Sequence, residues 1–400
     1  MKIGIISPGR LPVPPIKGGA VETLIKDLLM ENSVKKDLNI DLFSCYDKEI
    51  GDTDNIGYKL ITVKKSIIIE TLNNLIPNSF GRIQRLINKI KDYIYIQKVK
   101  KVILNSESNY DFIIIENKPN FIRSFNKILK AKFILHLHNS HIKEYSSHVF
   151  ENYDCIVTVS KYIKNEILNN HGYISTPIKI LYNCVSEEFI LSPKISKDII
   201  RKELGFGKND FIVTFVGRIV EEKGVMELVK AFKLIEDSNI KLMVIGSSWF
   251  ASEYKTEFVK KLEAEAKDIE SKIKFTGYIP HENLANTLQI SDTVVLPSIW
   301  NEPFGLTIIE SMALGKLVIT TNRGGIPEIF KGNDGVLLTA ENIVSEIAEK
   351  VVYYFNNPIE RTELERNAIE TVNSYYCRNT FYDEFIKILN ELKEGIKNEQ

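Results

Sequence analysis

The sequence lacks several features that mark particular classes of protein. Its 400 residues carry 52 Lys and Arg against 52 Asp and Glu. The net charge is therefore zero and gives no reason to expect a nucleic-acid partner. No uninterrupted apolar run approaches the roughly 18 residues of a membrane span. The first ten residues, MKIGIISPGR, are too short for a signal sequence because Pro8 and Gly9 interrupt them. These absences predict a globular cytoplasmic protein.

Cysteine is also scarce. Cys45, Cys155, Cys184 and Cys377 are scattered along the chain, with no C-x-x-C pair and no histidine cluster beside them. This pattern is typical of reduced thiols and excludes a disulfide framework or a zinc finger.

Short apolar runs alternate with helical patterns along most of the chain. The expected strands of the first half are KIGIIS, IDLFSCY, YKLITV, DFIIIEN, KFILHLH, DCIVTVS and IKILYN. Those of the second half are DFIVTFVGR, IKLMVIGS, IKFTGYI, DTVVLPS, KLVITT and GVLLT. Continuously apolar strands are expected where helices cover both faces of a parallel sheet. The sequence therefore predicts an α/β fold with two doubly wound, Rossmann-like domains.

We expect the first domain at residues 1–185 and the second at 199–376. The break falls in the polar loop 183–198, and a C-terminal helix within 377–400 is expected to pack back on the first domain. Other expected helices are Ala20–Met30, Lys161–Asn170 with Ser160 as its N-cap, and Phe381–Leu392. Two such domains would face each other across a cleft at the carboxyl ends of their strands, where ligands bind.

Glycines and cations follow the first strand of each domain. Gly18 and Gly19 open a helix, where free amides suit a phosphate, although a loop that needs only glycine's freedom is the alternative. Arg218 and Lys223 could together neutralise a diphosphate. They could equally form a solvated loop with the acidic residues at 221 and 222. Both interpretations remain open.

Two glutamates, Glu302 and Glu310, stand eight residues apart in the otherwise apolar stretch NEPFGLTIIESMALGK. Pro303 suits the first turn of a helix running to about Leu314, so we expect Glu302 at the cap and Glu310 two turns in. Carboxylates accept hydrogen bonds from hydroxyls, so the pair is predicted to hold two sugars. The intervening amides favour an anion; they belong to Phe304, Gly305, Leu306 and Thr307.

These motifs resemble the retaining GT-B glycosyltransferases of family 4. The resemblance rests on GR…EKG, FTGY, the run PSIWNEPFGLTIIESMALGKLVITT and GGIPEI, and the two glutamates match the family's E-x7-E spacing. It covers the chain from Lys2 to about Tyr375. The opening LPVPPIKGGAVE is similar to bacterial spore-coat and capsule-type members.

The resemblance implies transfer of a sugar from a nucleotide diphosphate sugar to an acceptor hydroxyl, with retention of configuration. UDP is the expected nucleotide, no metal or other cofactor is expected, and the acceptor is a glycan, a lipid-linked molecule or a protein. Surface glycan synthesis is the expected role. Two alternatives stay open, a UDP-sugar 2-epimerase-like enzyme and a non-catalytic partner subunit.

The resemblance also assigns roles to individual residues. Arg218, Lys223 and the Gly19 amide would hold the diphosphate. Glu302 with the amides after it would bind the donor sugar, and Glu310 the ribose. Backbone at Tyr278 and Ile279 would receive the base. His138 would lie near the reacting sugar, with His136 as its rival. The hinge departs from the family pattern, because residues 183–186 read NCVS where many members read NGVD.

Two further segments carry weaker signals. GDTDN at 51–55 has the D-x-D form of a metal site, but its glycine and asparagine favour a solvated turn. Residues 64–101 hold nine Lys and Arg against two acids in an amphipathic pattern. This segment predicts either peripheral contact with an anionic membrane, at the inner face of the plasma membrane, or a covering helix with solvated lysines.

Overall fold

The computed structural model describes residues 1–50, 57–64, 81–106, 109–125, 129–191, 195–247, 256–339 and 341–395. The chain divides into two compact units. The first comprises Met1–Leu181 together with Tyr382–Gln400, and the second comprises Tyr182–Phe381. Residues 182–185, which we assigned to the first domain, thus belong to the second unit. There the Val185 amide donates a hydrogen bond to the Tyr376 carbonyl.

The described part of the first unit contains a seven-stranded parallel sheet in the order β3-β2-β1-β4-β5-β6-β7. Its strands are β1 (Lys2–Ile6), β2 (Asn39–Cys45), β3 (Lys59–Val63), β4 (Phe112–Glu116), β5 (Lys132–Leu137), β6 (Cys155–Thr158) and β7 (Ile178–Ile180). Each lies within a predicted run or within one residue of it. The strand order reverses between β1 and β4, which is where doubly wound sheets bind ligands.

The second unit repeats this plan with six parallel strands in the order β10-β9-β8-β11-β12-β13. They are β8 (Phe211–Val216), β9 (Ile240–Ile245), β10 (Ile273–Gly277), β11 (Thr293–Leu296), β12 (Leu317–Thr321) and β13 (Val336–Leu338). The reversal falls between β8 and β11, so the loops after these two strands lie at the expected binding edge. The predicted fold class of two doubly wound units is confirmed.

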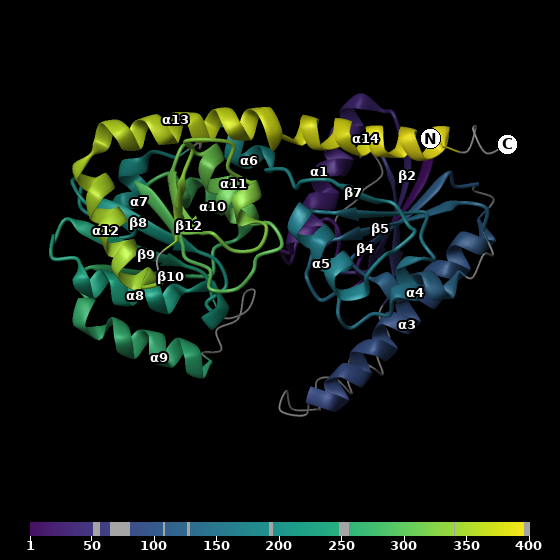
Figure 1. Cartoon of the computed structure of the whole chain (residues 1–400), viewed down its shortest axis with the longest axis horizontal. Helices are drawn as coiled ribbons and strands as arrows, with labels where there is room; N and C mark the ends of the chain where they lie inside the picture. Colours follow the sequence, from purple (N-terminus) through teal and green to yellow (C-terminus); the bar gives the residue numbers. More distant parts are fainter. Residues whose placement is uncertain are drawn as a thin grey trace. The chain divides into compact units, whose positions relative to one another are not determined.

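Continuous burial explains why these runs form central strands. Every residue of β4 (FIIIE) and of β8 (FIVTFV) is buried, as expected for strands with helices on both faces. In the second unit the helices α8 (Val225–Leu234), α9 (Glu257–Glu265) and α12 (Ile343–Asn356) share one apolar core with the strands, and Figure 1 shows them beside the sheet.

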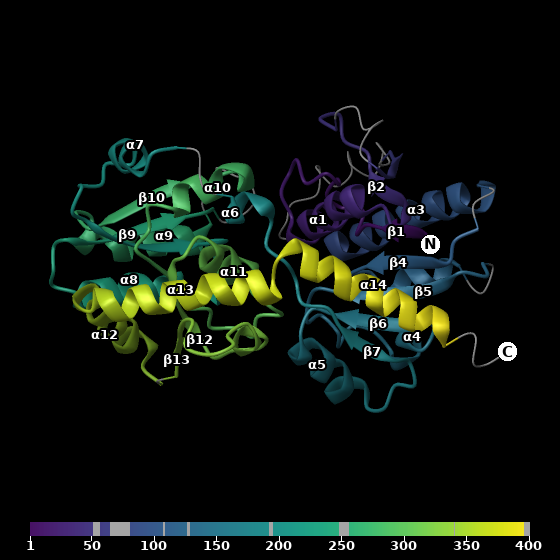
Figure 2. The same cartoon turned by 90° about the horizontal axis from the view of Figure 1, so that it is seen from above.

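Helices complete both units (Figures 1 and 2). The remaining helices of the first are α1 (Ala20–Lys35), α3 (Gly81–Asn105), η1 (Pro119–Ser124), α4 (Ser147–Phe150) and α5 (Lys161–His171). Those of the second are α6 (Glu187–Ile190), α7 (Lys197–Glu203), η2 (Glu221–Lys223), η3 (Ala266–Ile269), α10 (His281–Leu288), α11 (Leu306–Ala313), η4 (Ile326–Glu328) and α13 (Pro358–Tyr375).

Helix starts follow the local chemistry of the sequence. The Ser160 side chain accepts a hydrogen bond from the Ile163 amide and caps α5, as predicted. Gly19 precedes α1 with a φ of 112°, which glycine adopts without strain. The predicted start of α11 is wrong by three residues, because Gly305 has a φ of 125° and the helix begins only at Leu306.

The last helix, α14 (Arg378–Glu394), lies with the first unit over most of its length. The Tyr382 hydroxyl donates to Asn32 on α1, and Lys179 on β7 pairs with Glu391 at 2.7 Å. Figure 2 shows this helix crossing the first unit. It begins three residues earlier than the predicted Phe381.

None of the four cysteines, all within the described ranges, forms a disulfide, and all but the half-buried Cys377 are buried. No helix in the described ranges is both long enough and apolar enough to cross a bilayer. The D-x-D turn at 51–55 lies outside the described residues, as do 65–80 of the basic segment and 192–194 of the hinge loop.

Candidate functional site

Two loops of the second unit dock tightly at the edge where the strand order reverses. Gly224, between η2 and α8, has a φ of 70°, and a Cβ there would lie 1.9 Å from the Pro297 carbonyl oxygen after β11. The Ile299 amide donates to the Glu222 carbonyl at 3.0 Å. This close approach requires glycine and brings the residues around 223 next to those around 302.

Lys223 and Glu302 form the centre of this site. The Lys223 ammonium lies 2.5 Å from the Glu302 carboxylate, and the two side chains are 24% and 11% exposed. The ammonium also lies 5.8 Å from the centre of the Trp300 ring, within reach of a cation–π contact. A lysine and a glutamate predicted from separate motifs therefore meet at the edge where doubly wound sheets bind ligands.

Further contacts fix Glu302 in place. The Ser298 hydroxyl lies 2.8 Å from the same carboxylate oxygen. The Gly325 amide donates to the Glu302 carbonyl at 2.7 Å. A Cβ on Gly324 would lie 2.3 Å from that carbonyl oxygen. Ser298 opens the same motif but was not among the predicted site residues, and no sequence pattern connects the GGIPEI loop to this glutamate.

Arg218 takes a different partner from Lys223. Its guanidinium lies 2.9 Å from the Glu222 carboxylate, four residues along the chain, and both side chains are more than a third exposed. The solvated-loop interpretation thus describes the local pairing of Arg218, whereas Lys223 bonds to Glu302 instead of the neighbouring acids. An exposed pair of this kind is weak, so the guanidinium could exchange Glu222 for a phosphate.

We expected the segment between the two glutamates to be helical from Pro303, but it is not, because α11 begins only at Leu306. Glu302 lies four residues before the first residue of α11 and therefore does not cap it. The Phe304 ring is buried and packs against Tyr182 and Tyr376, with ring centres 6.0 and 5.8 Å away. The amides of Leu306 and Thr307 open the helix, where first-turn amides lack intrahelical acceptors.

Glu310 lies within the first turns of α11 and is buried. Its carboxylate contacts the His281 ring nitrogen Nε2 at 2.9 Å. His281 opens α10, two residues after Ile279, which is half-buried like Tyr278, so the residues predicted to hold ribose and base share one region. Sequence reasoning missed His281 because a lone histidine after a strand carries no distinctive pattern.

The other predicted residues lie in the first unit, again at carboxyl ends of strands. His138 follows β5, and its Nε2 lies 2.7 Å from the Glu116 carboxylate at the end of β4. The same oxygen lies 3.1 Å from Nδ1 of His136. His136 and His138 therefore share one carboxylate, and Glu116 is a residue that the sequence analysis did not single out.

Burial and charge set the ionisation of this cluster. Burial and the neighbouring His136 ring lower the pKa of His138 to about 4, against the opposing effect of Glu116. Burial alone would raise the pKa of Glu116, but the two imidazoles outweigh it and hold that pKa at about 2. At neutral pH, His138 is thus a neutral imidazole beside an ionised carboxylate.

Metal-ligating side chains also meet in this cluster. One oxygen of Glu116 and one nitrogen each of His136 and His138 lie within 4.8 Å of one another. The hydrogen bonds from both rings to the carboxylate account for this geometry without an ion. The expectation of no metal stays a prediction.

Gly18 and Gly19 precede α1, as predicted, and Glu22 in the first turn folds back toward them. A Cβ on Gly19 would lie 2.2 Å from a Glu22 carboxylate oxygen. Glu22 is buried, and burial followed by the charge of Glu116 raises its pKa to about 7. A phosphate at this helix start would therefore meet a carboxyl group that is half protonated at neutral pH.

Comparison with known proteins agrees with this architecture. Residues 196–371 match the family model described as Glycosyl transferases group 1. The chain is 25% identical to the putative glycosyltransferase YtcC of Bacillus subtilis, over 100% of this chain and 94% of that protein. It is 26% identical to spore coat protein SA of the same bacterium, over 88% and 89%. It is also 26% identical to lipopolysaccharide 1,2-N-acetylglucosaminetransferase of Salmonella typhimurium, over 84% and 85%.

Solved structures share the fold. A crystal structure of Alr3699/HepE from Anabaena in complex with UDP and glucose has a TM-score of 0.73 at 18% identity, over 98% of this chain and 99% of that one. Sucrose-phosphate synthase from Thermosynechococcus elongatus has a TM-score of 0.76 at 18% identity, over 99% and 100%. These similarities establish the GT-B fold. Together with the match of residues 196–371 to the group 1 model, they confirm the resemblance seen in the sequence: the chain is similar to the group 1 glycosyltransferases.

Proposed function

We propose that this glycosyltransferase moves a sugar from a UDP-sugar to an acceptor hydroxyl with retention of configuration and without a metal ion. The transferred sugar is a hexose or an N-acetylhexosamine, and the product belongs to bacterial surface glycan or glycoconjugate synthesis. The acceptor is a glycan, a lipid-linked molecule or a protein, and the enzyme acts in the cytoplasm.

The contact between Lys223 and Glu302 is the observation that carries this proposal. A cation and a carboxylate held 2.5 Å apart at the ligand-binding edge of a doubly wound sheet suit a ligand that is anionic at one end and rich in hydroxyls at the other. A nucleotide diphosphate sugar has this polarity. Its diphosphate would share the Lys223 ammonium, while Glu302 accepts hydrogen bonds from the sugar.

The chemistry follows from where negative charge develops. As the bond between the sugar and the diphosphate breaks, the leaving diphosphate gains charge. Lys223, Arg218 and the first amides of α11, all in the second unit, would stabilise that charge in the transition state. The acceptor hydroxyl attacks from the face that the diphosphate leaves, which retains the configuration. His138, neutral at pH 7 because burial lowers its pKa to about 4, would contact sugar hydroxyls.

A ligand-stabilisation experiment tests the donor site. UDP, GDP, ADP and CMP are added separately to the purified protein, with and without EDTA, and the melting temperature is measured. Binding to the folded state raises the melting temperature by mass action. We expect UDP to give the largest shift, EDTA to leave it unchanged, and Lys223→Ala to abolish it.

The matched control is Lys233→Ala. Lys233 lies on α8 and forms exposed ion pairs with Glu265 and Asp268, so its loss should leave the UDP shift intact. No shift with any nucleotide would overturn the donor assignment and favour the partner-subunit alternative. Turnover of UDP-sugar without an acceptor into its C2 epimer would favour the epimerase alternative.

We also propose that α3 contacts an anionic membrane surface. Ile83, Leu86, Ile90 and Tyr93 are 42–63% exposed, and their spacing of three and four residues places them on one helix face. Basic side chains on the same helix are Arg82, Arg85, Lys89, Lys91, Lys98, Lys100 and Lys101, against the single acid Asp92. An apolar stripe beside cations suits the headgroup region of anionic lipids.

Vesicle sedimentation tests this contact. We expect the protein to pellet with phosphatidylglycerol vesicles at low salt and to stay in solution with phosphatidylcholine. The double change Leu86→Gln with Tyr93→Gln should reduce the pelleted fraction, whereas Tyr173→Gln, which alters an 87% exposed side chain outside α3, should not. Equal pelleting of both variants would contradict the proposal that α3 contacts the membrane.

A further inference from the structure

A cavity of about 430 Å³ lies in the second unit, away from the loops that follow β8 and β11. Its lining includes Asp292, directly before β11, and Lys316, directly before β12. These residues lie at the amino-terminal edge of the sheet, opposite the edge that carries Lys223 and Glu302. The cavity is therefore separate from the candidate donor site.

Cations dominate the lining of this cavity. Five basic and two acidic residues line it, so its net charge is +3 (5 − 2). The basic residues are Lys197, Arg201, Lys316, Arg361 and Arg366, and the acidic residues are Asp292 and Glu365.

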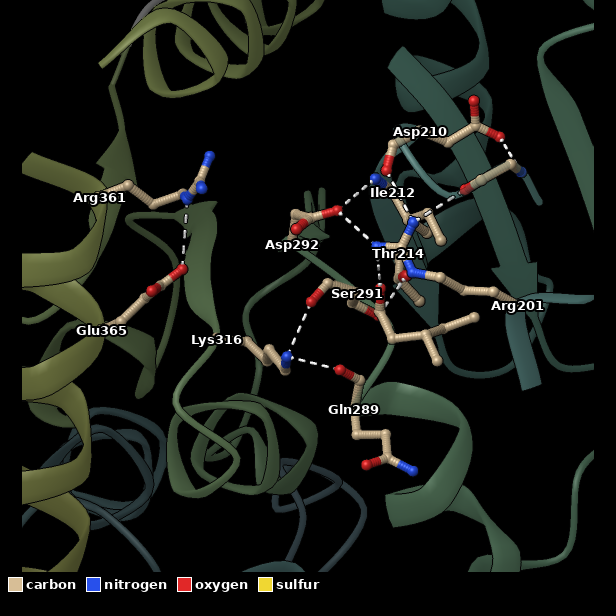
Figure 3. A network of polar contacts seen from close by, with 12 residues as sticks. Arg201, Asp210, Ile212, Thr214, Gln289, Ser291, Asp292, Lys316, Arg361 and Glu365 are labelled. Atoms are coloured by element: carbon tan, nitrogen blue, oxygen red, sulfur yellow. Dashed lines mark hydrogen bonds and ion pairs between the residues drawn. The ribbon is translucent and has the colours of Figure 1, made fainter. Parts of the chain in front are cut away.

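Both acids are already engaged. One Asp292 carboxylate oxygen accepts hydrogen bonds from the Ile212 amide at 2.8 Å and from Arg201 at 3.3 Å. Glu365 lies 3.4 Å from the Arg361 guanidinium (Figure 3). Neither carboxylate is paired with Lys316.

Lys316 is a buried cation whose hydrogen-bond partners are neutral. The residue is 7% exposed, and its ammonium donates to the carbonyls of Gln289 and Ser291, each at 2.8 Å (Figure 3). An ammonium has three N–H donors, so one remains without an acceptor among the described residues. Burial, followed by the charge of Lys197, lowers the pKa of Lys316 to about 8. The group is thus largely protonated at neutral pH, and a buried charge of this kind is stabilised by an opposite charge.

Two further cations at the rim have no partner among the residues that the structure describes. Lys197 on α7 and Arg366 on α13 are exposed, and neither forms a hydrogen bond or ion pair with any residue in the described ranges. The guanidinium of Arg366 can bind an oxyanion with two parallel hydrogen bonds, and Lys197 adds a point charge.

We propose that this cavity binds a small phosphate-bearing anion, with Lys316 at its base and Lys197 and Arg366 at its rim. Three cations without carboxylate partners match a ligand that carries two or more negative charges. A cavity of about 430 Å³ falls in the range of small-molecule sites and exceeds what a single phosphate fills. The ligand is therefore of the size of pyrophosphate or a phosphorylated sugar.

Pyrophosphate titration by calorimetry tests the site, with the full-length protein and saturating UDP present throughout to occupy the donor site. We expect the wild-type protein to bind pyrophosphate. The double variant Lys197→Ala with Arg366→Ala should have a dissociation constant for pyrophosphate that is at least about tenfold higher. Both changes lie on exposed helix positions, so the variant should fold. Lys316→Met should lose binding as well, and its melting temperature shows whether it folds.

Lys230→Ala provides the matched control, because Lys230 is an exposed lysine on α8 outside the cavity. Repeating the titration in Lys223→Ala, where the donor site is impaired, separates the two sites. Loss of the signal in that variant, with the double variant unaffected, would place the binding in the donor site and overturn this proposal. Equal affinity of wild-type protein and the double variant would also overturn it.

Discussion

The ammonium of Lys223 lies 2.5 Å from the carboxylate of Glu302, although 79 residues separate them in the chain. We expect Lys223→Met and Glu302→Gln each to lower kcat about 100- to 1000-fold, because each change removes a group that would act on the charge of the transition state. Initial rates with a UDP-sugar donor provide the measurement. Lys233→Met, a change to an exposed lysine on the same unit, should keep the wild-type rate. Activity within a few-fold of wild type in both site variants would contradict the assigned roles.

Gly324 sets the position of Glu302 from the neighbouring loop. Its φ is 60°, and a Cβ would lie 2.3 Å from the Glu302 carbonyl oxygen. We expect Gly324→Ala to lower the free energy of unfolding by about 1 to 3 kcal/mol through backbone strain and to reduce kcat by displacing Glu302. Gly332→Ala is the matched control, because nothing lies within 4 Å of a Cβ at that position. Urea unfolding and initial rates measure both effects, and identical behaviour of the two variants would rule out the positioning role.

His281 holds the second glutamate, with its Nε2 at 2.9 Å from Glu310. We expect His281→Ala to raise the KM for the UDP-sugar about tenfold with little change in kcat, because Glu310 is predicted to bind the ribose and not the reacting sugar. His148→Ala, which changes an imidazole that is 82% exposed, serves as the control. A fall in kcat at unchanged KM would instead place Glu310 in the chemical step.

The fold and part of the site could be predicted because they depend on local pattern. Central parallel strands such as β4 and β8 are buried on both faces, so their sequences are continuously apolar. Glu302 and Lys223 could be proposed because they belong to spaced motifs after strands. The start of α11 could not be placed, since Pro303 also suits a first turn. Only the positive φ of Gly305 reveals where the helix begins.

Contacts between distant loops escaped the sequence analysis for a physical reason. His281 follows β10 and Glu310 follows β11, so their contact depends on the strand order β10-β9-β8-β11 of the second sheet. No residue near either position encodes that order. Glu116 likewise meets His138 only because β4 and β5 are neighbours in register. His136 and His138, which the sequence presented as alternatives for one role, both contact the same carboxylate of Glu116. Nothing in the sequence pattern indicates that the two rings share a partner.

The ionisation of His138 can be followed directly by NMR. Because burial lowers its pKa to about 4, the ring should stay neutral and its chemical shifts constant from pH 8 down to about 5. An unperturbed imidazole would titrate near pH 6.5. The chain has six histidines, and His138→Gln assigns the signal. In Glu116→Gln the carboxylate that raises this pKa is lost, so any titration should move to still lower pH. A midpoint above 6 in wild-type protein would contradict the buried, neutral imidazole.

Glu22 should make stability depend on pH in the opposite sense to an ordinary surface carboxylate. Its folded-state pKa of about 7 lies above the ordinary value of 4.5, because burial and Glu116 disfavour the charged form. The folded state therefore binds more protons than the unfolded state between these values. The stability contributed by the protonated carboxyl is present below pH 4.5 and is lost as the pH rises through 7.

Glu22→Gln stays neutral at every pH and removes this dependence. The free energy of unfolding of wild-type protein, relative to that of Glu22→Gln, should fall by about 3 kcal/mol between pH 4.5 and pH 8. Urea titrations across this range measure the difference. Glu144→Gln, which alters an exposed carboxylate in the same unit, should show no such slope. A relative stability that rises with pH would mean that the Glu22 carboxylate is ionised and paired in the folded protein. The start of α1 would then already hold an anion where we predict a phosphate.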